Sequence, residues 1–488
     1  MSPSSDAQLE LGAVAPRFSR PLTWAIGLLL AGLMAGVWLP AWTADRTANL
    51  RYPAESAARL MERHIEFYVG LERLPAWQAG FYTWLYGDRA NALESAAEAY
   101  RDVLAHFESH PGSATEWATA NTRARLALVL LEAGDRKSAA EALATFGAMP
   151  EDSIVEDTIR YAYNLNPKPV SPGELQAGLR LMPVGWSTDT LGRRLAERQE
   201  ERWLADRIEA RQLRRAEVSR QSTGLLVLVT GGLMLAGAGA LGVHLVRRRP
   251  LAQAPPPRPS PAIWEFEEGI AVLVRAGFFG VLIYLLLGTL GSWFKPHLAA
   301  QWSTLLASIP MLWMIRRHLL APRALGFIQA FGLNPLRAGF IKVLGATLIL
   351  VLVERTGALL ISWSLWNVGV QPHWTEGLAE RWIWGPWQAT LISSVNTIAW
   401  APVLEEIGFR GLLFLTLRSR FGFAISAVLS AAVFSLLHPY SLAAMLAVLW
   451  SGFLWAYAFE RFRTLLPGML AHSATNFLAV TSILLIYR

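Results

Sequence analysis

Nine apolar segments run through the sequence, and most of them are long enough to cross the hydrocarbon core of a lipid bilayer. An α-helix rises about 1.5 Å per residue, so about 20 apolar residues span a core of roughly 30 Å. The segments are 21–42, 223–246, 269–294, 299–315, 340–366, 387–417, 421–438, 441–459 and 465–487. The composition, 53% hydrophobic and 17% charged, excludes a wholly soluble or disordered chain. We therefore predict an all-α membrane protein, a polytopic helical bundle of about nine spans with an extramembrane all-helical domain.

Basic residues at the ends of the apolar segments predict the orientation of the chain. Arg247, Arg248 and Arg249 close the second segment, and such clusters stay on the cytoplasmic side of a membrane. The tail before the first segment carries Arg17 and Arg20, so residues 44–221 should lie outside the cytoplasm. A cleaved signal peptide is the alternative for the first segment. The run is long for a signal core and no clear small-x-small cleavage site follows it, which favours a membrane anchor.

The apolar segments and a Pro-rich stretch divide the chain into five predicted parts. They are a cytoplasmic tail with the first anchor (1–43), an extracytoplasmic helical domain (44–221), a second span (222–249), a Pro-rich linker (250–264) and a membrane domain (265–488). Prolines in the linker lack the amide donors that a helix needs. We expect the linker to mark a domain boundary.

The outer region, 44–221, reads as helical and contains one candidate repeat. The pattern from Ala124 to Phe146 resembles a tetratricopeptide-type helix pair with a turn at Gly134 and Asp135. The packing positions of this pair are Leu126, Leu130, Ala139 and Leu143. An irregular helical domain with Ala-rich packing explains the same residues equally well, so both interpretations stay open.

Several function classes are excluded by residue counts and by missing motifs. The chain has no Cys, which removes disulfides, thiolate zinc sites, iron–sulfur clusters and a cysteine nucleophile. The net charge of +7 suggests nucleic acid as a partner, but many Arg flank apolar segments and no nucleic-acid-binding motif is present. We expect no nucleic-acid partner. Energy-coupled transport is disfavoured because the sequence lacks a P-loop, and a secondary transporter because no inverted pair of interrupted segments is visible.

Ionisable side chains inside apolar segments are functional candidates, because an unpaired charge in a membrane costs several kcal/mol. The last third of the chain has six such polar residues in three segments: Glu405, Glu406, Arg410, His438, His472 and Asn476. Other membrane charges, Glu354, Arg355 and Arg275, we interpret as structural. A cluster of six accumulates an insertion cost that isolated structural charges do not, which favours a shared site.

Helical spacing predicts which of the six residues lie on the same face. Glu406 and Arg410 are four residues apart and can pair, whereas Glu405 lies about 100° away around an α-helix. A carboxylate without such a partner suits a general base that acts on water. His472 and Asn476 have the same spacing and could donate together to an oxyanion. His438 follows Phe434 by four residues, which places an aromatic ring beside the imidazole.

Three motifs that contain these residues resemble those of a known family. The segments EEIGFR (405–410), FSLLH (434–438) and HSATN (472–476) are similar to EExxxR, FxxxH and HxxxN. In this order they are typical of the CAAX-protease and bacteriocin-processing family of intramembrane glutamic proteases. The resemblance covers about residues 265–488 and does not reach the outer domain.

The resemblance implies hydrolysis of a peptide bond in or at the membrane, in the manner of the type II CAAX prenyl endopeptidase. It implies that Glu405 and His438 activate water, that His472 and Asn476 stabilise the oxyanion, and that Glu406 and Arg410 hold the site together. The implied partners are the lipid bilayer and a peptide or protein substrate. The large outer domain suggests a bacterial chain, so we expect a multi-pass protein of the inner (plasma) membrane, with a protein partner as a candidate ligand of residues 44–221.

Two alternatives to this mechanism stay open. Two His and two Glu could ligate a catalytic zinc ion, although HExxH is absent and Asn is a poor zinc ligand, so we expect no cofactor. The other alternative is a non-enzymatic scaffold or immunity-type protein, in which the polar cluster is a packed core and the outer domain recruits partners.

Overall fold

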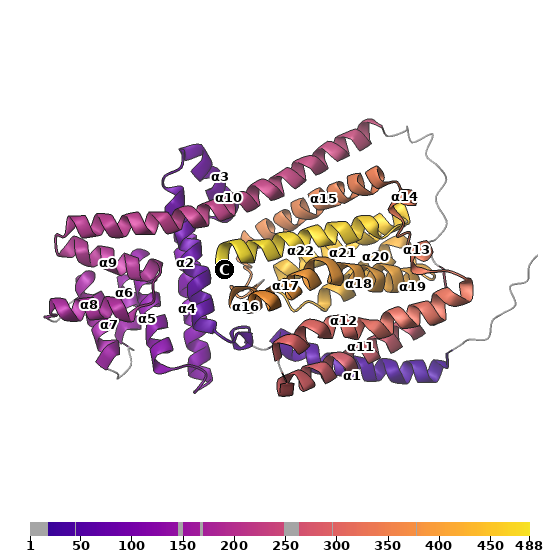
Figure 1. The fold of residues 1–488 in the computed structure, drawn as a ribbon, viewed down its shortest axis with the longest axis horizontal. Coiled ribbons are helices and arrows are strands. Elements are labelled where there is room, and N and C mark those ends of the chain that lie inside the picture. The colour runs from indigo at the N-terminus through magenta and orange to yellow at the C-terminus, as the bar shows by residue number, and fades with distance from the viewer. Residues whose placement is uncertain are drawn as a thin grey trace, which may run out of the picture. The chain divides into compact units, whose positions relative to one another are not determined.

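The protein is described here by a computed structural model that covers residues 18–43, 45–144, 150–165, 169–247, 263–294, 296–376 and 378–488. These residues form helices, turns and irregular segments and contain no strand, which confirms the all-α class. Arg17, Arg248, Arg249, Phe146 and residues 250–262 of the predicted linker lie outside the described residues. The chain forms two compact units, which are described separately (Figure 1).

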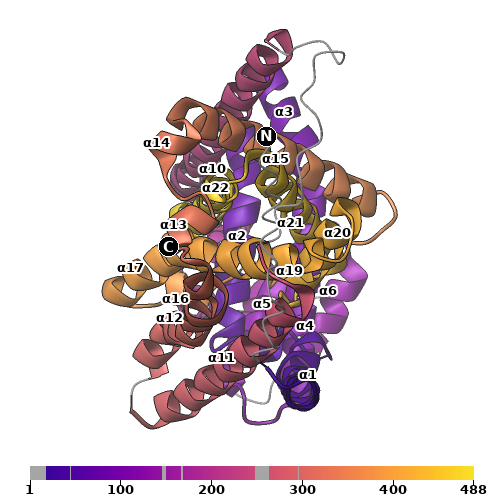
Figure 2. The same ribbon diagram turned by 90° about the vertical axis from the view of Figure 1, so that its right-hand side faces the viewer.

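The membrane unit consists of residues 18–42, 233–371 and 391–477. Its longer helices are α1 (Arg20–Thr43), the end of α10 (Arg202–Val246), α11 (Phe266–Phe294), α12 (Pro296–Met314), α15 (Phe340–Trp366), α20 (Phe423–Leu436), α21 (Leu442–Phe462) and most of α22 (Leu466–Tyr487). Its short helices are η3 (Ile315–Leu320), η4 (Ala321–Arg323), α13 (Phe327–Ala330) and α14 (Pro335–Ala338). Figure 2 shows the same ribbon turned by 90°, with α1 seen nearly end on.

Six of the described helices are long and apolar enough to cross a membrane: α1, α10, α11, α15, α21 and α22. On α1, Trp24 and Leu28 are 75% and 73% exposed, as side chains that face lipid would be. The other three predicted segments are helical as well, but α20 has only 14 residues and 387–417 is not a regular α-helix. The chain is therefore a multi-pass membrane protein.

The segment 387–418 is one continuous helix that changes type four times. It consists of α17 (Trp387–Val395), the π-helix η5 (Asn396–Trp400), α18 (Ala401–Glu405), the π-helix η6 (Glu406–Phe414) and α19 (Leu415–Arg418). Regular α-helical spacing, which we assumed for this segment, is therefore wrong over much of its length. Single π turns inside α-helices occur frequently at functional sites.

Buried aromatic and aliphatic side chains hold the membrane unit together. One core contains Ile315, Leu319, Phe331, Phe414 and Leu415, and a smaller one contains Leu350, Phe434, Leu454, Trp455 and Ala471. Arg275 of α11 donates to Thr23 Oγ1 of α1 at 2.9 Å and covers the Phe18 ring at 4.6 Å. These contacts agree with the structural role that we predicted for Arg275.

The second unit, named the outer unit after the predicted domain 44–221 that makes up most of it, consists of residues 43–232, 372–390 and 478–488. Its helices are η1 (Thr47–Asn49), α2 (Pro53–Leu71), α3 (Ala76–Tyr86), α4 (Arg89–Ser109), α5 (Glu116–Glu132), α6 (Arg136–Ala144), α7 (Pro150–Ala162), α8 (Pro172–Leu181), α9 (Trp186–Arg198), α16 (Glu380–Ile383) and the start of α10. The predicted division at residue 221 falls inside α10, which continues as one helix of 45 residues. The helices α9 and α10 are separated by a short break at 199–201.

The predicted helix pair is present as α5 and α6. Gly134 has φ +87° between them, and Asp135 accepts a hydrogen bond from the Ser138 amide at 3.0 Å. A positive φ favours Gly, which explains why this residue forms the turn. All four predicted packing residues, Leu126, Leu130, Ala139 and Leu143, are buried.

Residues 372–390 pack with this unit, which the sequence did not predict. Glu380 accepts from the amides of Arg51 and Tyr52 at 2.8 and 2.9 Å, and Arg46 pairs with Glu376 at 3.1 Å. Trp374 donates to Asp102 of α4 at 3.1 Å. The loop between α15 and α17 is thus a structural part of the outer unit.

We expect His64 of α2 to make the outer unit less stable in acid. Burial lowers the pKa of His64 to about 4, from about 6.5 when the side chain is free. Between these two pH values the unfolded chain binds more protons, so the free energy of unfolding falls as the pH falls. We expect protonation of this residue to lower the free energy of unfolding by about 2 kcal/mol between pH 7 and pH 4.

The measurement is denaturant unfolding of the wild type and His64→Phe at both pH values. Phe keeps the ring that packs at 5.3 Å from Tyr68 but cannot be protonated. The variant should lose less stability on acidification than the wild type, and an equal loss would contradict the assignment.

Candidate functional site

The six predicted site residues all lie in the membrane unit, five of them on two helical segments and one just beyond a third helix. Glu405 ends α18, and Glu406 and Arg410 belong to η6. His472 and Asn476 are one turn apart on α22. His438 was expected on a helix that extends to residue 438, but α20 ends at Leu436 and His438 lies just beyond it.

Glu406 and Arg410 form the predicted ion pair inside the protein. Arg410 Nη1 donates to Glu406 Oε1 at 2.9 Å, and both side chains have an exposed fraction of 0%. The predicted pair forms although η6 is a π-helix and not the α-helix that we expected. Both side chains are thus closed off from solvent.

Three aromatic rings surround the Arg410 guanidinium. Its carbon lies 4.6 Å from the Phe434 ring centre, 5.0 Å from Trp455 and 5.9 Å from Phe409. Within the described residues, Nε and Nη2 of Arg410 have no hydrogen-bond partner. Ring faces attract cations most strongly where water is excluded, so the rings compensate in part for the missing hydrogen bonds.

His472 lies between the two neighbouring carboxylates. Its Nε2 is 3.6 Å from Glu405 Oε2, and its Nδ1 is 3.5 Å from Glu406 Oε1. The imidazole stacks on Trp455, with ring centres 4.2 Å apart and an interplanar angle of 18°. Stacking fixes the plane of the ring, and both nitrogens are then directed toward acidic side chains.

Exposure separates Glu405 from its neighbour. The Glu405 side chain is 28% exposed, against 0% for Glu406. Of these two carboxylates, Glu405 is therefore the one that a water molecule can reach.

A backbone hydrogen bond determines the tautomer of His438. Its Nδ1 is 2.8 Å from the carbonyl oxygen of Phe434, which can only accept, so Nδ1 carries the proton. Nε2 of the neutral ring is then an acceptor. The His438 ring also packs against Phe434 at 4.9 Å, as the four-residue spacing predicted, and Phe434 lies 6.0 Å from His472. Phe434 thus lies beside both histidines.

Asn476 donates from Nδ2 to the carbonyl oxygen of Thr397 in η5, at 2.8 Å. An amide NH₂ has two protons, so one of them is available for another acceptor. This contact ties α22 to η5, and the sequence, which predicted a joint role for Asn476 and His472, did not predict it.

A carboxylate on α15 supports the same turn of α22, and sequence reasoning did not assign it to the site. Glu354 is 2% exposed and accepts a hydrogen bond from Thr475 Oγ1 at 2.7 Å. Thr475 precedes Asn476, so the bond restrains the helical turn that presents the amide. A buried Glu on a different apolar segment was the available signal, but nothing in the sequence paired it with residue 475.

Gly452 of α21 provides the space that Arg410 occupies. A Cβ atom at this position would lie 2.8 Å from Arg410 Nη2 and 3.1 Å from the Cβ of Ala431. We expect Gly452→Ala to lower the free energy of unfolding by about 1–3 kcal/mol, because the buried guanidinium cannot move away without losing its partners.

The matched control for this change is Gly345→Ala on α15, where nothing lies within 4 Å of an added Cβ. Ala is the better helix former, so the control should be neutral or slightly stabilising. Chemical denaturation in detergent compares the two, and equal stabilities would contradict the close packing at Gly452.

Comparison with known proteins supports the motif analysis over part of the chain. Residues 386–478 match the family model described as type II CAAX prenyl endopeptidase Rce1-like. The match contains all six site residues but covers under a fifth of the chain, and it is narrower than the predicted range 265–488. No curated protein and no solved structure matched the chain.

Proposed function

We propose, from the type II CAAX prenyl endopeptidase Rce1-like domain that residues 386–478 form, that the chain is an intramembrane endopeptidase of the glutamic type. One observation carries the choice of mechanism. Of two adjacent carboxylates, Glu406 is sealed against Arg410 while Glu405 is partly exposed beside His472. A general base must be reachable by its water, and Glu405 meets this requirement.

The proposed reaction needs no covalent intermediate. Glu405 takes a proton from water, assisted by the acceptor nitrogen of His438, and the hydroxide oxygen attacks the carbonyl carbon of the peptide bond. His472 and the free N–H of Asn476 donate to the resulting oxyanion. The intermediate then collapses, the C–N bond breaks, and the proton passes from Glu405 to the leaving nitrogen. Glu406, Arg410 and Glu354 hold the helices that carry these groups.

The alternative with a catalytic zinc ion would use the same residues. His438, His472 and the two carboxylates would have to serve as its ligands. The pairing of Glu406 with Arg410 at 2.9 Å occupies one of these four groups, which favours the reaction without metal.

The outer unit offers a surface on which a protein partner or a substrate could bind. A groove of about 550 Å³ lies along α4 and α5. Its lining contains basic, acidic and apolar side chains, among them Arg89, Glu94, Arg101, Asp135, Leu93 and Ala97. We propose that it receives a polar, extended peptide segment, and that residues 44–221 lie outside the cytoplasm of a bacterial cell.

The experiment is hydrolysis of a mixed library of quenched peptides by the purified protein in lipid vesicles. The arms are wild type, Glu405→Gln and Glu460→Gln, each with and without a strong chelator. Glu460 is a suitable control because it pairs with Arg418 at 3.1 Å and belongs to none of the motifs. Activity that is lost only in Glu405→Gln supports the glutamic mechanism.

Other outcomes select the alternatives. Loss of activity with chelator in both wild type and Glu460→Gln would favour the zinc enzyme. Absence of hydrolysis by every arm, from protein that is folded by circular dichroism, would favour the scaffold, and capture of partners on residues 44–221 would then be measured.

A further inference from the structure

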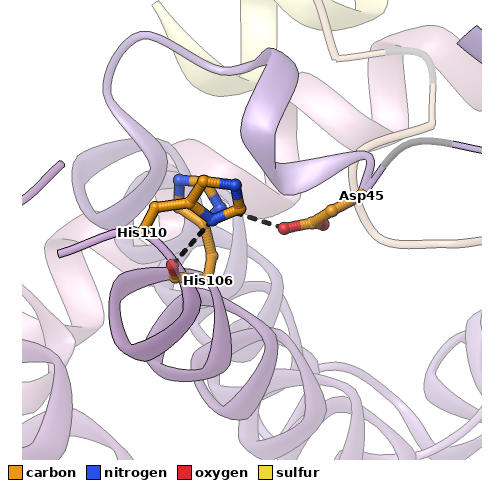
Figure 3. Close-up of side chains that lie close together, drawn as sticks. All are labelled: Asp45, His106 and His110. Carbon is orange, nitrogen blue, oxygen red and sulfur yellow. Dashed lines mark hydrogen bonds and ion pairs between the residues drawn. The ribbon is translucent and has the colours of Figure 1, made fainter. Parts of the chain in front are cut away.

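Three side chains of the types that bind metals meet in the outer unit, away from the protease motifs. His106 lies in the last turn of α4 and His110 directly follows that helix, while Asp45 precedes η1 (Figure 3). Each of the three offers one ligand atom, and these atoms all lie within 4.8 Å of one another. Within the part of the chain that the structure describes, no second group of three or more His, Asp or Glu comes this close.

The two histidines are brought together by helical spacing. They are four residues apart, and their ring centres lie 4.6 Å from each other. Two His four residues apart are a common way to supply two imidazoles to one ion, and here the second of them is the residue that caps the helix. His106 is 7% exposed and His110 is exposed, so the pair reaches from the protein interior to solvent.

Hydrogen bonds prepare His110 for a ligand. Its Nδ1 is 3.2 Å from the carbonyl oxygen of His106 and 3.0 Å from Ser109 Oγ. A carbonyl can only accept, so Nδ1 carries a proton and Nε2 keeps a lone pair. Histidines that bind metals usually donate their other N–H to a carbonyl or a carboxylate in this way.

Asp45 is held in a fixed orientation beside His106. Its Oδ1 accepts from the Thr47 amide at 2.9 Å, which leaves Oδ2 at 2.9 Å from His106 Nδ1. This second distance suits a hydrogen bond, and a separation of about 3 Å is also what two ligands of one ion require. The Asp45 side chain is 40% exposed, so solvent can complete the coordination.

We infer that Asp45, His106 and His110 form a binding site for a divalent transition metal of the zinc class. Two imidazoles and one carboxylate suit zinc, and the open side leaves room for water as the remaining ligand. The bound ion would join residues 45–49 to the end of α4, two segments about 60 residues apart in sequence. The inferred role of the ion is structural: it links two segments of the outer unit. This role does not depend on the protease activity.

The test uses the full-length protein, purified without a histidine tag and stripped with a chelator. Zn²⁺ is titrated by calorimetry, and Co²⁺ by its visible absorption. We expect one equivalent of either metal per chain, at least tenfold weaker binding in Asp45→Asn, and loss of binding in His110→Ala. His110 is the preferred position because it is exposed, so its removal should not prevent folding. Zn²⁺ should also raise the unfolding temperature of the wild type and not that of His110→Ala.

Two controls identify other modes of binding. His244→Ala removes an exposed imidazole of α10, and Glu405→Gln alters the protease motifs, so both should keep one equivalent. Metal binding that survives in Asp45→Asn and His110→Ala, or that disappears in Glu405→Gln, would overturn the inference. So would the absence of binding by folded wild type. His110→Ala also gives a clean background for the chelator arm of the peptidase assay, because a chelator would otherwise act on two candidate sites.

Discussion

Replacing Glu405 with Gln is expected to lower kcat for peptide hydrolysis by about 10³-fold, with a smaller effect on KM. General-base catalysis contributes about 10²–10⁴-fold to such reactions, and Gln cannot accept the proton of the attacking water. Gln keeps the size and the hydrogen-bonding oxygen of the side chain, so the contact near His472 should persist. The change therefore removes the chemistry and retains the packing.

Initial rates over a range of peptide concentrations separate the two kinetic constants. Glu460→Gln makes the same chemical change at the Arg418 pair and should leave both constants near those of the wild type. A Glu405→Gln enzyme with more than about a tenth of wild-type kcat would show that another group is the base, since a general base contributes at least about 10²-fold.

Replacing Arg410 with Met is expected to destabilise the membrane unit by about 3–5 kcal/mol. The substitution leaves the Glu406 carboxylate buried without its cation, and an uncompensated buried charge is among the most unfavourable single changes. Removing both charges together, as in Glu406→Leu with Arg410→Met, should restore much of the loss, because a buried ion pair can often be replaced by apolar residues of similar volume.

The matched comparison is the pair Arg418–Glu460, whose side chains are 13% and 20% exposed. Arg418→Met should destabilise the protein by no more than about 1 kcal/mol, since solvent can still reach Glu460. Unfolding in denaturant measures the wild type and all three variants. If the double variant at 406 and 410 is no more stable than Arg410→Met alone, the loss comes from the aromatic contacts of Arg410 and not from the stranded carboxylate.

The sequence predicted the pairing within the site better than it predicted the backbone. Apolar length located every long helix of the membrane unit, and four-residue spacing found both the Glu406–Arg410 pair and the Phe434–His438 contact. It could not find the hydrogen bonds of Glu354 with Thr475 or of Asn476 with Thr397, because each joins helices that are distant in the chain. The position of residues 372–390 in the outer unit escaped prediction for the same reason.

The hydrophobic pattern also does not distinguish a π-helix from an α-helix. A π-helix and an α-helix bury similar faces over a few residues, so η5 and η6 leave no mark in hydropathy. The Asp45, His106 and His110 cluster was missed because Asp45 is about 60 residues from the other two. The His-x-x-x-His spacing at 106 and 110 was the available signal, and it lay in a region where no chemistry was expected.

The two π-helical stretches make the site sensitive to changes in length as well as to changes in side chain. A π turn contains more residues than an α turn, so deleting one residue from 406–414 would let the backbone return to regular α geometry with its hydrogen bonds intact. The helix would survive such a deletion. Residues beyond the deleted turn would keep nearly the same orientation, because a π turn holds about one residue more than the α turn that replaces it, but a deletion between Glu406 and Arg410 would change their spacing from four residues to three. A scan of single-residue deletions would then find that helix formation and site assembly respond independently, a distinction that substitutions cannot make.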